Sequence, residues 1–311
     1  MAFMNETCLL SICIPTYNRF DKLQLCLECI TDAIKNYSGY IEIIISDNHS
    51  NDETANIIEH YKTKIPNLTS YRNEDNYGFN KNMLLLLNNY SRGKYIWMIG
   101  DDDYIDSNAI SQIINIILDY KSNIILVKHR IFHNIENFVA FRRKNIGLPD
   151  VSKNDNVKFL AFSKAMDNIA VPSNIFCTFF SSVIFKKNMI KREYFNHIQD
   201  NHWDKFYNVF PNAYLIINSF HNEKNVCVIN NILISVVEGK KNWDDKLDLI
   251  WLKHIPDLYN YIEELNIKSR DLRKSRYIIV KNNILLLRKI KHIKEFIVIK
   301  KIINNIIHIL F

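Results

Sequence analysis

Short apolar runs alternate with stretches of helical periodicity through the first hundred residues, and this alternation constrains the fold more than any other feature. Four runs have the length and β-branched composition of buried strands, namely Leu9–Ile14, Ile41–Ile45, Leu68–Tyr71 and Lys94–Ile99. Helix-like stretches lie between them, at about 21–37, 52–64 and 80–90. Strands that alternate with helices in this way are typical of a mostly parallel sheet flanked by helices. The sequence therefore predicts an α/β fold.

Polar clusters directly follow three of the four predicted strands. Thr16–Arg19 follows the first strand, Ser46–Asn48 the second, and Asp101–Asp103 the fourth. In parallel sheets the ligand crevice lies at the carboxyl ends of the strands. We therefore expect the three clusters to meet at one edge of one sheet.

The triplet Asp101-Asp102-Asp103 gives the strongest indication of chemistry. Adjacent carboxylates repel one another unless a cation neutralises them. Hard divalent ions bind through one or two carboxylates together with substrate phosphates. The alternative is a solvated acidic loop or a helix N-terminus, but a position directly after a buried strand favours a metal site. Asp47 can likewise accept a hydrogen bond from a nucleoside, or it simply forms a turn or helix cap.

Four segments resemble motifs of family 2 glycosyltransferases, the inverting enzymes with the GT-A fold. They occur in the family's order and cover about residues 9–105, as Leu10–Arg19, Ile43–Asp52, Asn76–Asn82 and Gly93–Asp103. The resemblance implies a GT-A fold, a nucleotide-diphosphate sugar donor and a divalent metal, Mn²⁺ or Mg²⁺. No G-x-G-x-x-G or P-loop motif occurs in the sequence, which disfavours a dinucleotide dehydrogenase or an ATPase.

The resemblance also implies roles for individual residues. The loop after the first strand and Asp47 are expected to hold the nucleoside, while the acidic triplet holds the metal between the two phosphates. The expected nucleotide-sugar-binding residues are Pro15, Thr16, Tyr17, Asn18, Arg19, Asp47, Asn48, Asn76, Gly78, Asn82, Asp101 and Asp102. The metal is assigned to Asp101, Asp102 and Asp103. Which of the three contact it stays open, because Gly100 stands where many family members have a further acid.

An inverting transfer needs one general base that takes the proton from the acceptor hydroxyl. In the family this base is an acid well after the metal motif. Asp200 is the candidate here, with Asp204 second and His197 or His202 behind them. The family's usual Glu-Asp pair is absent from this segment, and helix capping is an equal alternative for Asp200.

Beyond residue 123 the pattern is less regular. Strands are expected at 124–127, 178–185 and 226–237, and a helix at 154–167. We expect a catalytic domain over 1–240, with a nucleotide-binding half at 8–105 and an acceptor half at 106–240, and a helical, basic extension over 241–311. From Lys268 onward twelve Lys or Arg residues accompany only two acids, so this tail carries +10 and the rest of the chain −3 of the net charge of +7.

Two apolar stripes in the tail favour amphipathic helices, one through Leu286, Ile290, Ile293 and Ile297, the other from Ile299 to Leu310. A basic amphipathic helix suits contact with an anionic membrane surface, or packing on the catalytic domain. Nucleic-acid binding is disfavoured, because surface aromatics are not interleaved with the basic residues.

The sequence shows no secretory signal, and Cys26 and Cys29 form a C-x-x-C in an apolar helical context that favours core packing. We therefore expect a cytoplasmic protein, peripheral on the inner face of the membrane. The predicted function is sugar transfer to a glycan or lipid-linked glycan acceptor in surface polysaccharide or lipooligosaccharide biosynthesis. The alternatives are a nucleotidyltransferase with a similar metal site and a catalytically silent membrane-bound scaffold.

Overall fold

The computed structural model describes residues 8–34, 37–145, 157–169, 178–200, 202–239, 246 and 249–267. Its first half contains β1 (Leu10–Thr16), α1 (Phe20–Ile34), η1 (Ser38–Tyr40), β2 (Ile41–Asp47), α2 (Thr54–Lys62), β3 (Leu68–Arg72), α3 (Phe79–Leu85), η2 (Leu86–Tyr90), β4 (Tyr95–Met98), β5 (Asp103–Ile105) and α4 (Ala109–Tyr120). Its second half contains β6 (Ile124–Phe132), α5 (Ile135–Asn145), β7 (Val157–Leu160), α6 (Phe162–Ile169), η4 (Phe180–Ser182), β8 (Val183–Lys186), η5 (Lys187–Met189), η6 (Arg192–His197), α7 (Phe206–Val209), α8 (Pro211–Phe220), β9 (Val226–Val237), η8 (Ile250–His254) and α10 (Ile255–Glu264).

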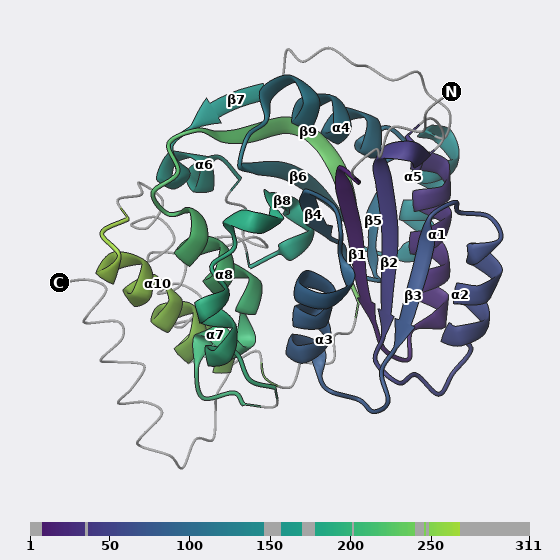
Figure 1. The fold of residues 1–311 in the computed structure, drawn as a ribbon, viewed down its shortest axis with the longest axis horizontal. Coiled ribbons are helices and arrows are strands. Elements are labelled where there is room, and N and C mark those ends of the chain that lie inside the picture. Colours follow the sequence, from purple (N-terminus) through teal and green to yellow (C-terminus); the bar gives the residue numbers. More distant parts are fainter. Residues whose placement is uncertain are drawn as a thin grey trace.

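One mixed sheet runs through the molecule in the order β3-β2-β1-β4-β8-β6-β9-β5, with β7 added on β9 (Figure 1). The strands β3, β2, β1 and β4 are all parallel, as the alternating pattern predicted. Beyond β4 the sheet is mixed, because β8 runs antiparallel to both β4 and β6. The α/β fold is thus confirmed, and the parallel part of the sheet lies between Leu10 and Met98. The nucleotide-binding half expected at 8–105 stays a prediction.

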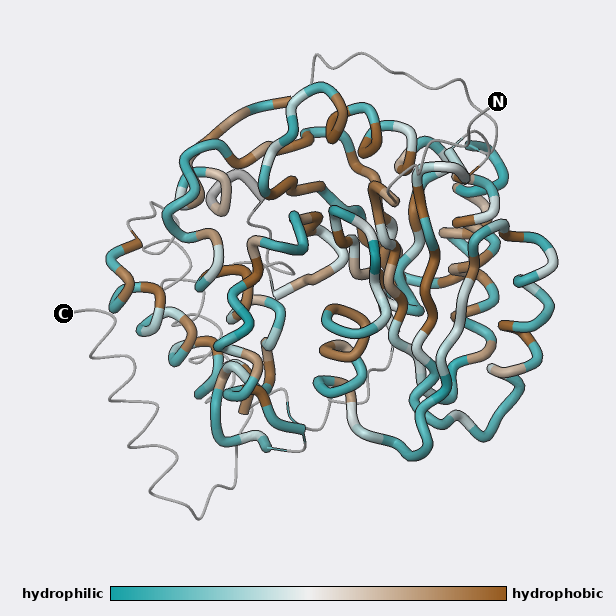
Figure 2. Tube along the Cα trace, viewed as in Figure 1, coloured by the Kyte–Doolittle hydropathy of each residue, from teal (hydrophilic) through white to brown (hydrophobic). Residues whose placement is uncertain are grey.

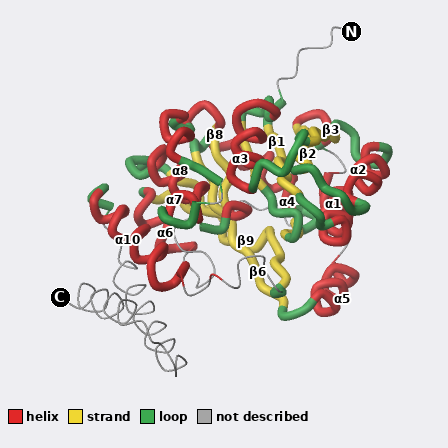
Figure 3. The backbone as a smooth tube through the Cα atoms, turned by 90° about the horizontal axis from the view of Figure 1, so that it is seen from below, coloured by secondary structure: helices red, strands yellow, loops and turns green. Residues whose placement is uncertain are grey.

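The two faces of the sheet are covered by different helices. Successive residues of a strand point to opposite faces, so Cys13 belongs to the core cluster that includes residues of α3, α8 and α10, while Ile12 and Ile14 belong to the cluster that includes residues of α1 and α4. Hydrophobic residues concentrate along the strands, and the surrounding helices and loops are more polar (Figure 2). Seen from below, the strands run between helices (Figure 3). The arrangement buries both faces of the central strands.

The less regular middle of the chain accounts for the differences from the sequence-based predictions. Residues 157–160 form strand β7 rather than the first half of the predicted helix at 154–167, and the helix α6 begins only at Phe162. Pairing with β9 decides this, because β7 lies antiparallel along Val226–Ile229. The strand predicted at 178–185 is shorter, with a 3-10 turn before β8.

The predicted division at residue 240 stays a prediction, although α10 packs into the same core cluster as α8. The amphipathic stripes from Leu286 to Leu310 lie outside the described residues. Among the residues that are described, no helix is long and apolar enough to cross a membrane.

Glu42 is a buried acid at the amino ends of the central strands, on the opposite edge from the predicted site. It is 3% exposed and accepts hydrogen bonds from Ser11 Oγ at 2.6 Å, Arg92 N at 2.6 Å and Arg92 Nε at 2.8 Å. Burial alone raises the pKa of Glu42, but these donors hold the pKa below its usual range. Glu42 therefore joins β1, β2 and the turn before β4 as a carboxylate.

We predict that Glu42→Gln lowers the free energy of unfolding at pH 7 by about 1–3 kcal/mol, because charge-assisted hydrogen bonds to a buried group are lost. A depressed pKa contributes stability above the unfolded pKa of about 4.3, and this contribution disappears as the pH falls below that value. The wild type and the variant should therefore converge in acid. Urea unfolding between pH 3 and 7 measures this, and Glu59→Gln, on a carboxylate with 68% of its side chain exposed, is the control. Equal stability of the two variants at pH 7 would contradict the assignment.

Candidate active site at the carboxyl ends of the strands

The ends of β1 and β4 are adjacent, and their polar residues contact each other. Thr16 Oγ1 donates to Asp101 Oδ2 at 2.8 Å. Arg19 Nη1 lies 3.0 Å from Asp101 Oδ1 and 3.2 Å from Asp102 Oδ2. Lys22 Nζ, in the first turn of α1, is 3.8 Å from Asp102 Oδ2. Two of the predicted clusters therefore form one charged network across β1 and β4.

Burial affects the charge of Asp101. The residue is 4% exposed, and burial raises its pKa to about 6, with Asp102 adding to the rise and Arg19 and Thr16 opposing it. The carboxylate of Asp101 thus depends on Arg19 for its charge balance.

Asp102 and Asp103 point to different partners. The side chain of Asp102 is 18% exposed, compared with 6% for Asp101. Asp103 is buried and accepts a hydrogen bond from Ser181 Oγ at 2.5 Å, and the same hydroxyl accepts from Gly100 N at 3.1 Å. Within the part of the chain that the structure covers, no three His, Cys or acidic side chains converge as a ready-made metal cage. The accessible oxygens of the triplet are therefore mainly those of Asp102.

Asp47, at the end of β2, is held by two neighbours. Its Oδ1 accepts from Ser50 N at 2.9 Å, and its Oδ2 accepts from Arg72 Nη1 at 2.9 Å. Arg72, at the end of β3, also donates through Nη2 to Ser50 O at 2.6 Å. Half of the Arg72 side chain is exposed, at 47%. Arg72 was not predicted from the sequence, because a single Arg at the end of an edge strand carries no distinctive pattern.

The loop after β1 is tied to the loop after β2. Asn18, with a left-handed φ of 50°, donates its N–H to Ser50 Oγ at 2.9 Å and accepts from Asn51 N at 2.8 Å. Pro15 is buried in β1, whereas Tyr17 is 38% exposed. The predicted nucleoside loop therefore offers the ring of Tyr17 while Asn18 is used internally.

Four asparagines form a connected network beneath this edge. Asn82 accepts from Ser46 Oγ at 2.6 Å and from Asn73 Nδ2 at 2.9 Å. Asn73 also donates to Asn48 Oδ1 at 2.8 Å, and Asn48 donates to Asn76 Oδ1 at 2.7 Å. Asn48, Asn73 and Asn82 are at most 5% exposed. These side chains fix the Gly78 turn against β2, and the sequence analysis missed Asn73.

Asp200 reaches this turn from the other half of the sheet. Its Oδ1 accepts from Asn80 N and its Oδ2 from Lys81 N, both at 2.7 Å, so Asp200 caps the start of α3. Burial raises its pKa, while these two N–H groups oppose the rise. Asn80, which the sequence analysis also missed, donates through Nδ2 to Gln199 O and Asn208 O, both at 2.9 Å.

The other candidates for the base lie near this segment and make separate contacts. Asp204 is exposed, and its carboxylate accepts from Asn208 Nδ2 at 3.4 Å. His197 Nδ1 lies 2.6 Å from the Tyr214 hydroxyl. His202 is exposed. Asp200 alone among the four candidates is hydrogen-bonded to α3, which leads back to the Gly78 turn.

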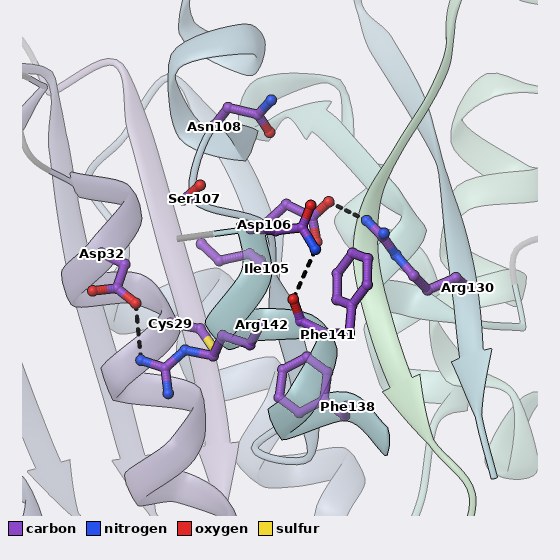
Figure 4. Close-up of a pocket in the computed structure, with 11 residues that line it drawn as sticks. Cys29, Asp32, Ile105, Asp106, Ser107, Asn108, Arg130, Phe138, Phe141 and Arg142 are labelled. Atoms are coloured by element: carbon purple, nitrogen blue, oxygen red, sulfur yellow. Dashed lines mark hydrogen bonds and ion pairs between the residues drawn. The ribbon is translucent and has the colours of Figure 1, made fainter. Parts of the chain in front are cut away.

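A cavity of about 180 Å³ lies at the end of β5 opposite Asp103. It is surrounded by α1, β6 and α5 (Figure 4). Its charged side chains pair with one another: Arg142 Nη2 lies 2.8 Å from Asp32 Oδ2, and Arg130 forms an ion pair with Asp106. These pairs connect α5 to α1 and β6 to the end of β5. The cavity therefore lies among the elements that pack around β5. Its lining residues are separate from the polar cluster at the strand ends.

Comparison with known proteins identifies the family. The sequence profile of glycosyl transferase family 2 matches residues 11–192, more than half of the chain and all of the strand-end cluster around Asp47 and Asp101. The chain belongs to glycosyl transferase family 2. The resemblance seen in the four sequence motifs is thereby confirmed.

Several curated glycosyltransferases are similar in sequence. The abequosyltransferase RfbV of Salmonella typhimurium is 35% identical over 119 residues, which are 38% of this chain and 35% of that protein. The poly(ribitol-phosphate) β-N-acetylglucosaminyltransferase TarP of Staphylococcus aureus is 27% identical over 157 residues, 49% of this chain and 46% of the relative. The match thus spans less than half the length of either relative.

Solved structures show the same fold. TarS residues 1–349 from S. aureus, in complex with UDP-GlcNAc, align with a TM-score of 0.57 at 14% identity, covering 97% of this chain and 90% of that one. The mannosyltransferase PcManGT from Pyrobaculum calidifontis, in complex with GDP-Man and Mn²⁺, aligns with a TM-score of 0.52 at 13% identity, covering 97% and 80%. At these identities the comparison establishes the GT-A fold, as predicted.

We predict that Gly78→Ala destabilises the protein by about 1–3 kcal/mol, the cost of a non-glycine residue in a backbone region open mainly to glycine. Gly78 has a φ of +85°, and an added Cβ would lie 2.4 Å from Asp200 Oδ1. Chemical denaturation measures the loss. Gly239→Ala is the matched control, since nothing lies within 4 Å of its added Cβ. Equal stability of the two variants would contradict this role for Gly78.

Proposed function

We propose that this family 2 protein transfers a sugar from a nucleoside-diphosphate sugar to a hydroxyl of a glycan or glycolipid acceptor, with inversion at the transferred carbon. The observation that carries the proposal is the network of Thr16, Arg19, Asp101 and Asp102, which lies inside the matched family segment. It combines carboxylates for a metal with cations for phosphate oxygens at the ligand-binding edge of the sheet.

The nucleoside is assigned to the edge formed by β1, β2 and β3. Asp47 and Arg72 are partly occupied by each other, yet Arg72 keeps 47% of its side chain exposed and so retains donor capacity. Tyr17 is 38% exposed and offers a ring for stacking on a base. Asn48, Asn76, Gly78 and Asn82 then contribute by holding the loop that faces the donor.

The donor set fits a hard divalent ion, because two carboxylates together with phosphate oxygens are sufficient for Mg²⁺ or Mn²⁺. Asp102 and Asp103 are the proposed ligands, and Asp101 holds the Thr16–Arg19 loop through its two hydrogen bonds. When bound, the metal neutralises charge on the leaving diphosphate. Arg19 and Lys22 lie beside Asp102 and supply positive charge to the same phosphates.

Asp200 is the proposed general base. Each of its oxygens accepts one backbone N–H from α3, which leaves lone pairs for an acceptor hydroxyl. The two N–H groups fix the orientation of the carboxylate, and proximity in a fixed orientation lowers the barrier to proton transfer. Burial raises its pKa and so makes it a better proton acceptor when ionised.

The acceptor is assigned to the class of surface glycans by analogy, since the names of the similar proteins describe an abequosyltransferase and a poly(ribitol-phosphate) transferase. Contact of the C-terminal tail with an anionic membrane stays a hypothesis from its sequence pattern.

We predict that the protein binds UDP, GDP or dTDP more tightly in the presence of Mn²⁺, and that Asp102→Asn and Asp103→Asn abolish the effect of the metal. Loss of charge stabilisation on the leaving diphosphate should lower transfer by on the order of 10²-fold or more. Isothermal titration and donor turnover measure the two effects, with Glu59→Gln as the control. Preference for a nucleoside triphosphate would favour the nucleotidyltransferase alternative, and no nucleotide binding would favour the silent scaffold.

We predict that Asp200→Asn lowers kcat for transfer by about 10²- to 10⁴-fold, the usual contribution of a general base. The amide oxygen of Asn can accept only one of the two N–H groups of α3, so stability should fall by about 1–3 kcal/mol while diphosphate binding changes little. Asp204→Asn is the matched control and should keep its activity. Full activity of Asp200→Asn would mean that the Asp200 carboxylate caps α3 and is not the general base.

A further inference from the structure

An aromatic pair joins the two segments that contact the proposed catalytic groups. Phe79 is the first residue of α3, and Phe180 is the first residue of η4. Their ring centroids are 5.9 Å apart at an interplanar angle of 37°. The two residues are about a hundred positions apart in the sequence, so the fold brings them together.

Phe180 is linked to the acidic triplet through its neighbour in the chain. Ser181 Oγ donates to Asp103 Oδ2 at 2.5 Å and accepts from Gly100 N at 3.1 Å. A residue next to Ser181 therefore lies within a few ångströms of the end of β4. Phe180 also packs against the core cluster that contains Met83 and Met98, which gives its ring a rigid backing.

Phe79 is linked to Asp200 in the same way. It precedes Asn80 and Lys81, whose N–H groups both donate to the Asp200 carboxylate at 2.7 Å. In Figure 1, α3 stands between the strands β1–β3 and the helices α7 and α8. The aromatic pair thus bridges the space between the triplet, through Ser181, and Asp200, through the start of α3.

The packing of α3 does not account for the exposed ring of Phe79. The residues that α3 buries are Asn80, Asn82 and Met83, while Phe79 is 45% exposed. An exposed ring contributes little to folding, because apolar area stabilises only when it is removed from water. Its ring face is therefore available to an apolar surface of a ligand between metal site and base.

We propose that Phe79, backed by Phe180, is the platform on which the acceptor stacks, and that the acceptor presents the C–H face of a pyranose ring. This inference rests on the proposed sugar transfer and names its acceptor class. A pyranose has one face rich in C–H groups, and its contact with an aromatic ring removes apolar area from water. An open-chain alditol phosphate has no such rigid face.

The test compares acceptors and variants. The donor probes are UDP-GlcNAc, UDP-glucose and GDP-mannose, and the acceptor probes are methyl hexopyranosides and D-ribitol 5-phosphate. Phe79→Ala is expected to raise KM for the pyranoside about tenfold, while hydrolysis of the donor by water and diphosphate binding stay unchanged. Phe79→Tyr keeps the ring and should restore the wild-type KM. Tyr40→Ala removes an exposed ring of similar exposure, 40%, from the opposite edge of the sheet and is the control.

Two outcomes would overturn the inference: an unchanged pyranoside KM in Phe79→Ala, or wild-type transfer to ribitol 5-phosphate in preference to every pyranoside. In both outcomes the enzyme still hydrolyses the donor, so neither outcome refutes the proposed function. Failure of the wild type to bind diphosphate or turn over any donor would instead refute the proposed function itself. Unfolding curves of Phe79→Ala and Phe79→Tyr separate a change in acceptor binding from a change in folding.

Discussion

The ion pair between Arg19 and Asp101 is the interaction on which the architecture of the site depends. Asp101 is buried at the end of β4, where an isolated carboxylate is costly unless a cation accompanies it. Arg19 supplies that cation from the loop after β1, and Thr16 adds a hydrogen bond from the same loop. Because β1 and β4 are neighbours in the sheet, satisfying one buried charge also fixes the loop that is proposed to face the donor.

A second set of contacts joins the two halves of the sheet. The asparagine network holds the Gly78 turn against β2, and Asp200 and Asn80 then connect this turn to residues 199–208. The proposed donor and acceptor sides therefore share one short helix, α3. A displacement at its start would move Phe79 and Asp200 together, which keeps the proposed stacking surface and the proposed base in register.

Much of the first half was predictable, because buried parallel strands and amphipathic helices have periodicities that the sequence records directly. The meeting of Thr16, Arg19 and Asp101 followed from the rule for strand ends. Ser181, Arg72 and Phe180 did not follow, because their roles depend on which distant segment the sheet places beside them. Strand β7 was mistaken for helix for the same reason, since pairing with β9 overrode local preference.

The bonds from Asn80 to Gln199 and Asn208 end on main-chain carbonyls. Every amino acid has such a carbonyl, so these two bonds place no demand on the side chains at positions 199 and 208. The exposed side chain of Gln199 can therefore be exchanged while the loop stays anchored to α3, whereas Asp200 and Asn208 are also held through their own side chains. Because these bonds are made to the main chain, the position of the loop does not depend on the side chain at position 199. Specificity could therefore evolve there without a change in the fold of the site.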